Sequence, residues 1–383
     1  MRRRSFLAGA GATLALPAVA QAQGQRVLKF IPQSDLAVLD PIWTTAYVTR
    51  NHGYMVYDTL YGQAGQKHGF RAEPQMLEGH VVENDGKTWK LTLRDGLMFH
   101  NGEKVLARDC VASIKRWGAR DAFGQALMAR TDDLSAPDDK TIVFRLKKPF
   151  ALLPDALCHG ASNMCAIMPQ RIAETDPYKQ VTEVIGSGPF KWKADERVQG
   201  SLFVYEKFDK YQPRPSGESS FTAGPKVVLF DRVEWHIQPD PATKAAALQA
   251  GEMDWWENPT ADLLPLLRKN KVKTEITDST GNMYMLRPNQ LYPPFDNPAI
   301  RRALLGAIDQ REFMIAMMGD DTSLWQAPVG FFPPTSPLAS EAGMSVLTGK
   351  RDPAAVKTAL EKAGYRGEKV VFMVGTDQPT LDA

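Results

Sequence analysis

Short strands and amphipathic helices follow one another along this chain without a strict βαβ alternation. Residues 88–94 alternate apolar and polar side chains, which predicts a strand with one buried face. In residues 109–117, Val111, Ile114 and Trp117 recur at helical spacing. The mixture favours α/β or α+β lobes over a barrel or a sandwich, and no repeat of fixed period is found.

Three further helices are predicted by an acidic or amide residue followed by proline, at Asp240, Asn297 and Asp352. Such a side chain caps the first turn, and proline is tolerated at the first helical position. Similar patterns predict strands over 27–31, 141–146, 201–205, 227–237 and 370–374 and a helix over 54–60. A chain of 383 residues corresponds to two or three domains.

The first 22 residues are typical of an export signal rather than of a folded segment. Arg2, Arg3 and Arg4 precede an uncharged run of small and apolar residues that ends in Ala20-Gln21-Ala22. We expect cleavage near Ala22 and a periplasmic protein. The arginines and the Phe-Leu pair after them favour the twin-arginine route over the general secretory route. No later apolar run reaches the about 20 residues that span a bilayer, so the mature chain is expected to be soluble.

Charge and cysteine content exclude several classes of protein. The 46 basic and 44 acidic residues nearly cancel, so the chain lacks the basic surface of a nucleic-acid binder. Three cysteines exclude a disulfide-built scaffold and a four-cysteine zinc site.

Sequence signatures of catalysis are also missing. The chain has no G-x-S-x-G, P-loop, H-E-x-x-H or C-x-x-C motif, and its six histidines are scattered. We therefore predict no catalytic residue, no metal ligand and no cofactor, and a protein that is not an enzyme.

Four segments together resemble the extracellular solute-binding proteins of family 5, the peptide, nickel and opine receptors of ABC importers. The order and spacing of the segments agree with that family from about residue 27 to 375. They are 91–103 with 107–116 (LTLRDGLMFHNGE and ARDCVASIKR), 185–190 (IGSGPF), 245–254 (AAALQAGEMD) and 294–309 (PFDNPAIRRAL running to AID).

This resemblance implies an α/β, two-lobed fold like that of type II periplasmic binding proteins, with an extra subdomain inserted in the first lobe. Lobe I would take in 26–60 and 186–278, the inserted subdomain 61–185, and lobe II 279–383. Members of the family usually run well past 383 residues, so we expect an incomplete second lobe. We also expect an exposed sheet edge near 370–374.

The resemblance further implies that a small peptide or related solute binds between the lobes and closes them about a hinge. A monomer would then deliver the solute to a permease in the inner membrane. A receptor for a nickel complex, an opine or a sugar is an alternative. A periplasmic enzyme or a haem or metal carrier, and a nonfunctional truncated paralogue, are further alternatives.

Candidate ligand-binding residues follow from the family by position. The stretch after Leu39-Asp40-Pro41 borders the cleft in the family, and so does the strand before the Pro-Phe segment at 294. Trp325, in a proline-rich loop of lobe II, is another candidate for a wall of the ligand site. The candidates are Trp43, Thr44, Thr45, Tyr47, Tyr284, Asn289 and Trp325. For Trp43 and Tyr47, packing beneath the lobe surface is an equal alternative.

Several other residues have two interpretations. Arg287 either binds an anionic group or is solvated, and we favour solvation. Trp255 and Trp256 either wall a pocket or lie in the core and at its rim, which we favour. For Cys158 and Cys165 the two interpretations are a disulfide bond, which the oxidising periplasm allows, and two free thiols. Arg301 or Arg302 is expected to form a structural ion pair.

Overall fold

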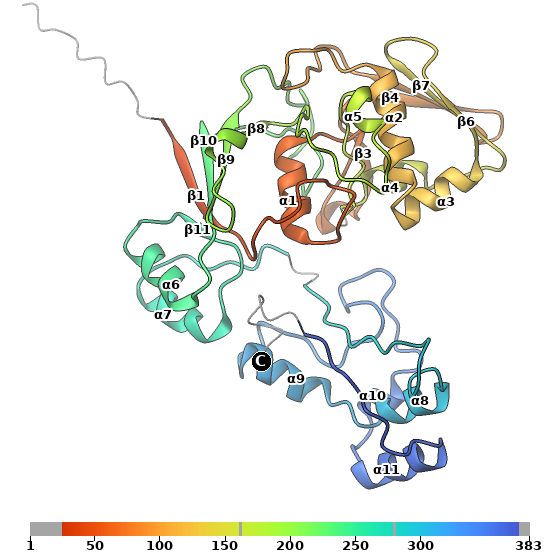
Figure 1. Cartoon of the computed structure of the whole chain (residues 1–383), viewed down its shortest axis with the longest axis vertical. Coiled ribbons are helices and arrows are strands. Elements are labelled where there is room, and N and C mark those ends of the chain that lie inside the picture. The colour runs from red at the N-terminus through yellow and green to blue at the C-terminus, as the bar shows by residue number, and fades with distance from the viewer. Residues whose placement is uncertain (1–24, 161–162, 279–280, 375–383) are drawn as a thin grey trace, which may run out of the picture.

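The computed structural model describes residues 25–160, 163–278 and 281–374 (Figure 1). The predicted export signal therefore lies outside the described residues. In Figure 1 the chain divides into an N-terminal region, residues 25–278, and a C-terminal region, residues 281–374. Every helix in the described residues is too short or too polar to cross a bilayer.

A five-stranded sheet forms one side of the N-terminal region. Its order is β11-β1-β10-β9-β8. Strand β1 runs parallel to β10 and β11, and Phe30 is paired with both Trp235 and Trp255. The pairs β10–β9 and β9–β8 are antiparallel. The strands are β1 (Val27–Ile31), β8 (Phe190–Trp192), β9 (Leu202–Lys207), β10 (Arg232–His236) and β11 (Trp255–Trp256).

The chain between β1 and β8 builds a second layer around a sheet of its own. This sheet is antiparallel, with the order β4-β5-β7-β6. Its strands are β4 (Leu77–Glu83), β5 (Thr88–Leu93), β6 (Thr131–Ser135) and β7 (Thr141–Leu146). A separate two-stranded ladder joins β2 (Tyr61–Gln63) to β3 (Ala72–Pro74). The buried residues Leu91, Ile114, Trp117 and Phe144 belong to one apolar core of this layer.

Helices cover this second sheet and connect it to the first. They are α1 (Tyr47–Val56), α2 (Ala107–Gly118), α3 (Ala122–Arg130), α4 (Leu153–Cys158) and α5 (Gln170–Ala173). In Figure 1, α1 lies between the five-stranded sheet and the layer that holds α2 and α3. A second core, which includes Val56, Tyr57, Tyr205 and Trp235, fills the space beside α1.

Helices flank strand β11 at the end of the N-terminal region. They are α6 (Pro241–Gln249) and α7 (Leu264–Lys269), and a third small core there contains Ile31, Ala245, Trp256 and Leu267. Three 3₁₀ turns are η1 (Gln66–His68), η2 (Ala194–Glu196) and η3 (Ala261–Leu263).

The regular elements among the described residues of the C-terminal region are helices, and turns and loops make up most of the rest. It contains α8 (Pro298–Leu305), α9 (Gln310–Met318), α10 (Ser345–Thr348) and α11 (Pro353–Lys362). No strand is assigned among the described residues 281–374. Ile300 of α8 is buried, whereas α9, α10 and α11 contain no buried residue. This region therefore has far less core than the N-terminal region.

Local patterns in the sequence predicted many of these elements. The strands at 88–94 and 141–146 are confirmed as β5 and β7. The three proline-marked helices are confirmed as α6, α8 and α11. In each, the predicted capping side chain accepts a backbone N–H, from Thr243 for Asp240, from Ala299 for Asn297 and from Ala355 for Asp352.

Two kinds of secondary-structure prediction are wrong. The helix placed at 54–60 is observed as α1, which ends at Val56 because Tyr57 adopts an extended conformation. Residues 370–374 and the stretch before Pro294 form no strand. A strand needs a neighbour to satisfy its backbone, and no neighbouring strand is described there. The expected exposure at 370–374 is observed, with Met373 90% exposed.

Two further expectations concern single side chains. Neither Arg301 nor Arg302 of α8 takes part in an ion pair among the described residues, so the expected ion pair is not observed. Instead, Nη1 of Arg301 donates to the backbone oxygens of Phe295 and Asp296 at 2.5 and 3.2 Å. Cys110, Cys158 and Cys165 are all free and buried, so the optional pairing of Cys158 with Cys165 is not observed.

Candidate functional site

Three parallel strands end at the same edge of the five-stranded sheet. Because β1 is parallel to β10 and β11, their carboxyl ends, at Ile31, His236 and Trp256, lie together. We call this place the carboxyl edge. In open α/β sheets, ligands bind outside the carboxyl ends of the strands. The carboxyl edge is therefore the first place to look for a binding site.

Glu257 follows β11 directly and ties the carboxyl edge to α1. Its Oε2 accepts the backbone N–H of Gln33 at 2.9 Å, and its Oε1 accepts from Nδ2 of Asn51 at 2.7 Å. Burial raises the pKa of the Glu257 carboxyl, although both hydrogen bonds act in the opposite direction. The bond to Gln33 fixes the carboxylate, and the bond from Asn51 turns the amide nitrogen of Asn51 towards Glu257, so that the amide oxygen is free to accept.

Arg50 donates hydrogen bonds to the side-chain amide oxygen of Asn51. Its Nε and Nη2 donate to Asn51 Oδ1 at 3.3 and 3.1 Å, and its Nη1 donates to the backbone oxygen of Gly160 at 3.3 Å. The guanidinium carbon also lies 4.2 Å from the centroid of the Tyr47 ring. These contacts hold the guanidinium in one orientation at the start of α1.

Aromatic side chains border the same edge. Tyr47 is 45% exposed and Trp255 is 49% exposed, while Trp256 is buried. Trp255 packs edge to face on Phe30, with the ring centroids 4.9 Å apart. The favoured interpretation of the tryptophan pair is therefore confirmed, with Trp256 in the core and Trp255 at the rim. Exposed aromatic rings offer a ligand a large apolar surface. Few rotations of these side chains have to be frozen when the ligand binds.

Four of the predicted ligand residues lie on the loop before α1 and at its first residue. Trp43 is half-buried, and the guanidinium of Arg120 lies 5.0 Å from its ring centroid. Thr44 is half-buried and accepts the backbone N–H of Ala46 on Oγ1 at 3.2 Å, whereas Thr45 is exposed. Tyr47 is the residue that Arg50 stacks on. The structure thus brings these four side chains to one end of α1.

A buried ion pair anchors this loop. Arg116 of α2 donates to both carboxylate oxygens of Asp40, at 3.0 and 2.7 Å. The Asp40 carboxylate also accepts the backbone N–H of Val181 at 3.0 Å. Trp43 in turn donates its backbone N–H to the carbonyl oxygen of Asp40 at 3.1 Å. The position of the loop therefore depends on a contact with the second layer.

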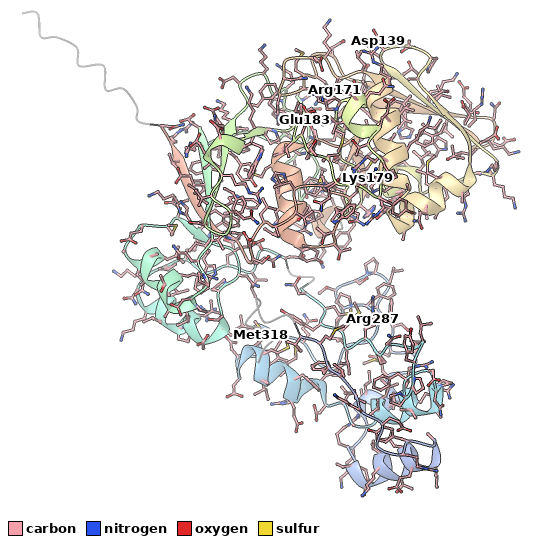
Figure 2. The ribbon with its side chains drawn as sticks, in the orientation of Figure 1. Asp139, Arg171, Lys179, Glu183, Arg287 and Met318 are labelled. Atoms are coloured by element: carbon pink, nitrogen blue, oxygen red, sulfur yellow. The ribbon has the colours of Figure 1, made fainter. Side chains whose placement is uncertain are left out.

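The other three predicted ligand residues lie in the C-terminal region. Tyr284 is 37% exposed, and Asn289 is exposed and accepts the backbone N–H of Leu291 at 3.1 Å. Trp325 is half-buried and donates Nε1 to the oxygen of Gly319 at 3.0 Å. No contact recorded among the described residues joins these three to the four at α1. Arg287, in the same region (Figure 2), is exposed, as the favoured interpretation expects.

One ion pair connects the two regions away from these residues. Nη1 of Arg268, on α7, lies 3.7 Å from a carboxylate oxygen of Asp321, just after α9. Both side chains are about half exposed, so water screens the interaction and its contribution is small.

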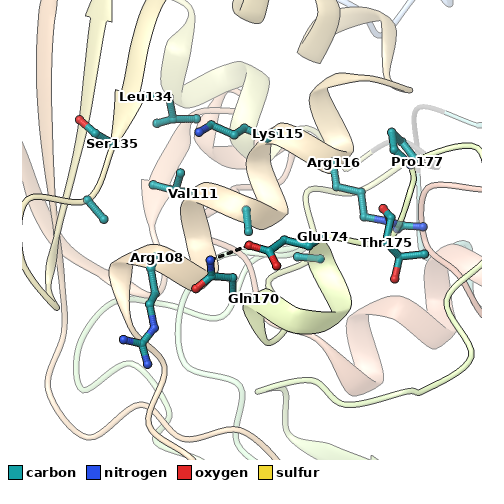
Figure 3. Close-up of a pocket in the computed structure, with 13 residues that line it drawn as sticks. Arg108, Val111, Lys115, Arg116, Leu134, Ser135, Gln170, Glu174, Thr175 and Pro177 are labelled. Carbon is teal, nitrogen blue, oxygen red and sulfur yellow. Dashed lines mark hydrogen bonds between the residues drawn. The ribbon is translucent and has the colours of Figure 1, made fainter.

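A hollow of about 540 Å³ lies elsewhere, between α2, β6 and α5 (Figure 3). Its lining includes Arg108, Val111, Leu134, Gln170 and Glu174, and none of the predicted ligand residues. A hydrogen bond of 2.6 Å from Gln170 to Glu174 occupies its α5 side. The hollow is separate from the carboxyl edge.

No cluster of three or more His, Cys, Asp or Glu side chains suited to a metal ion occurs in the described residues. Two of the histidines are held neutral by their surroundings. Burial lowers the pKa of His52 to about 3 and that of His100 to about 4.

Sequence reasoning missed Arg50, Asn51 and Glu257. One usable signal was the spacing of Tyr47 and Arg50, three residues apart on a helix and hence neighbours on its surface. A second was an acidic residue directly after the Trp255-Trp256 pair. The pairing of Asn51 with Glu257, 206 residues apart, has no local signal.

Comparison with known proteins identifies the family. The model of "Bacterial extracellular solute-binding proteins, family 5 Middle" matches residues 71–383, and the chain belongs to that family. A probable peptide ABC transporter periplasmic-binding protein of Sinorhizobium fredii is 37% identical over 98% of this chain and 71% of its own length. The dipeptide-binding protein DppE of Bacillus subtilis is 29% identical over 76% of this chain and 53% of its own. The glutathione-binding protein GsiB of Salmonella typhimurium is 26% identical over 87% of this chain and 60% of its own.

Solved structures show the same fold. A periplasmic binding protein from A. tumefaciens in complex with agropinic acid has a TM-score of 0.74 and 21% identity, over 93% of this chain and 68% of that one. DppA from Helicobacter pylori in complex with a peptide has a TM-score of 0.66 and 21% identity, over 89% of this chain and 67% of that one. The fold is thus the two-lobed α/β fold of type II periplasmic binding proteins.

Proposed function

We propose that this family 5 chain is the periplasmic substrate-binding component of an ABC importer and that its solute is a small peptide or a related small molecule. The solute binds between the two lobes, the lobes close about the hinge, and the closed form docks on a permease in the inner membrane. The protein acts as a monomer, binds no nucleic acid and catalyses no reaction. Its export signal is cleaved near Ala22.

The observation that carries the proposal is the polar and aromatic surface at the carboxyl edge, on a chain of this family. Tyr47 and Trp255 offer exposed rings, and Arg50 offers oriented donors. Large apolar faces with a few fixed polar groups are what small-molecule sites present. Ligand binding by such a surface needs no reactive residue.

The proposed domain limits are lobe I at 26–60 and 186–278, the inserted subdomain at 61–185 and lobe II at 279–383. The sheet organisation supports these limits, because the antiparallel sheet β4-β5-β7-β6 falls within 61–185. The strands of the other large sheet fall on either side of that segment.

The proposed ligand contacts come from both lobes. Trp43, Thr44, Thr45 and Tyr47 lie at the start of α1, close to Arg50. Tyr284, Asn289 and Trp325 belong to the C-terminal region and reach the solute only when the lobes close. Closure driven by contacts that exist only in the closed state is the expected mechanism.

Two measurements on the full mature chain test this function. Isothermal titration with a panel of dipeptides, glutathione, mannopinic acid, a nickel–histidine complex and a disaccharide should give binding to at least one member. Small-angle scattering should then show a smaller radius of gyration with that member bound. Binding without compaction contradicts hinge closure. Turnover of the bound compound supports an enzyme instead, and binding to no member supports the nonfunctional paralogue.

A further inference from the structure

Phe221 occupies a strained position of the backbone. It is the first of the two central residues of a tight turn between Ser220 and Ala223, whose backbones exchange two hydrogen bonds of 3.0 Å. The φ angle of Phe221 is +53°, whereas Thr222, the other central residue, has no positive φ. Glycine is the usual residue at the first central position of such a turn. A bulky residue with positive φ is an outlier, and such outliers concentrate at functional sites.

Contacts with β2 and the residues after it hold this turn in place. Thr222 donates its backbone N–H to the oxygen of Gln63 at 3.0 Å, and Gln63 donates its own to Thr222 Oγ1 at 2.7 Å. Ser220 Oγ accepts the backbone N–H of Gly65 at 3.0 Å. None of these bonds involves the side chain of Phe221, so they would hold the turn equally well with glycine at that position.

The ring of Phe221 also contributes little to the core. The residue is 61% exposed, and its ring lies against the α-carbon of Gly160, where a Cβ would be 2.3 Å from Cε1 of the ring. An exposed ring stabilises a fold far less than a buried one, because little apolar area is removed from water. Strain and exposure together indicate that the ring serves a contact beyond the fold itself.

Gly160 connects Phe221 to the start of α1. The oxygen of Gly160 accepts from Nη1 of Arg50 at 3.3 Å, and the guanidinium carbon of Arg50 lies 4.2 Å from the centroid of the Tyr47 ring. Phe221, Gly160, Arg50 and Tyr47 are therefore successive neighbours, with an exposed ring at each end of the series. Two exposed rings beside polar groups suit a solute that carries an apolar side group on a polar backbone.

We propose that Phe221 is a specificity-determining residue, which contacts a large apolar or aromatic side group of the solute near the start of α1. This inference rests on the proposed function and adds to it the chemical class of the solute. A solute with glycine in place of the residue that carries that group loses the contact and binds more weakly.

The experiment compares solutes with and without the apolar side group. Isothermal titration of the full mature chain would use the dipeptide Ala-Phe with Ala-Gly, and Met-Leu with Met-Gly. Packing of the side group against one ring corresponds to about a threefold to tenfold gain in affinity. The wild-type chain should bind the apolar member of at least one pair more tightly by that factor or more.

The variants are Phe221→Gly, which removes both the ring and the strain, and Phe221→Tyr, which keeps the ring. We expect Phe221→Gly to lower the ratio of apolar to glycine affinity about threefold to tenfold. Its melting temperature should be equal to or above that of the wild type, because glycine adopts positive φ without strain. A merely structural ring would give the opposite pair of results. Phe221→Tyr should keep most of the ratio.

The matched control is Asp85→Gly. Asp85 is exposed, also has a φ of +53°, and lies in the hairpin between β4 and β5, away from the start of α1. Its replacement by glycine relieves the same kind of strain. It should leave the melting temperature equal or higher and the affinity ratio at the wild-type value.

The outcomes separate this inference from the proposed function. A wild-type ratio kept by Phe221→Gly, an equal loss of affinity for both members of a pair, or a clear fall in the melting temperature of Phe221→Gly overturns the role of Phe221. The transport function stands in each of these cases. It also stands if the wild-type chain binds another member of the wider panel but neither dipeptide pair, which overturns this inference alone. If the chain binds no member at all, both proposals fail.

Discussion

The guanidinium of Arg116 and the carboxylate of Asp40, 76 residues apart, form a two-point hydrogen-bonded ion pair that is almost fully buried. Arg116 also donates to the backbone oxygens of Thr175 and Lys179. The pair thus fastens the loop that carries Trp43 to Tyr47 onto α2 and the segment after α5. It gives the candidate site a rigid support that lies outside the site.

Breaking this pair should destabilise the protein strongly. Asp40→Asn leaves Arg116 buried without its countercharge, which costs about 3–5 kcal/mol. Urea unfolding of the variant should give a lower midpoint with an unchanged slope. The control is Glu183→Gln, which breaks the exposed ion pair of Glu183 with Arg171, both labelled in Figure 2, and should leave the midpoint nearly unchanged. Equal effects of the two substitutions would contradict the account of Asp40.

Acidification should destabilise the protein partly through His52. This side chain is fully buried, its Nδ1 is 2.9 Å from the Tyr205 hydroxyl, and burial lowers its pKa to about 3. Since the unfolded chain binds the proton near the ordinary value of 6.5, stability is full above that pH and declines as the pH falls towards 3.

The measurement is urea unfolding at several pH values between 7 and 4, for the wild type and for His52→Gln. The variant should be less stable at pH 7 but should lose less stability on acidification. A residual loss is expected, because His100 is also held neutral, with its pKa lowered to about 4. A variant that follows the wild-type pH dependence throughout would show that His52 is not responsible.

A side chain at Gly186 should disturb the packing of the five-stranded sheet against α1. A Cβ there would lie 2.0 Å from the backbone oxygen of Val56, which cannot move freely because Gly188 donates to it at 2.8 Å. Gly186→Ala should therefore cost about 1–3 kcal/mol. Gly79→Ala in β4 is the control, since a Cβ there meets nothing within 4 Å. Melting temperatures should fall for Gly186→Ala alone.

All three cysteines should be unreactive in the native protein. Burial raises the pKa of each thiol, that of Cys158 to about 12, so the reactive thiolate is scarce at neutral pH. Titration with a disulfide reagent should label almost no thiol in buffer and three in guanidinium chloride. One labelled thiol in denaturant would instead reveal a disulfide between Cys158 and Cys165.

Local features of the structure could be predicted from the sequence because their causes are local. A capping carboxylate and the proline after it act within one turn, so the starts of α6, α8 and α11 were predicted correctly. Period-two alternation likewise located β5 and β7. At 370–374 the apolar run was correctly noticed, but a strand depends on a pairing partner that the run itself does not encode.

The candidate site was only half predictable. Family resemblance placed Trp43 to Tyr47 near a ligand, and the structure groups them at the start of α1. The polar chain from Glu257 through Asn51 to Arg50 joins residues that are distant in sequence. Only the parallel pairing of β1 with β11 brings Glu257 next to α1, and that pairing was not foreseen.

The most direct test of the central claim is the electron density of a crystal of the mature protein purified with its natural solute. We predict density for a solute at the carboxyl edge, in contact with Tyr47. Density only in the hollow beside Val111, or a solute-bound crystal with the carboxyl edge empty, would contradict the claim.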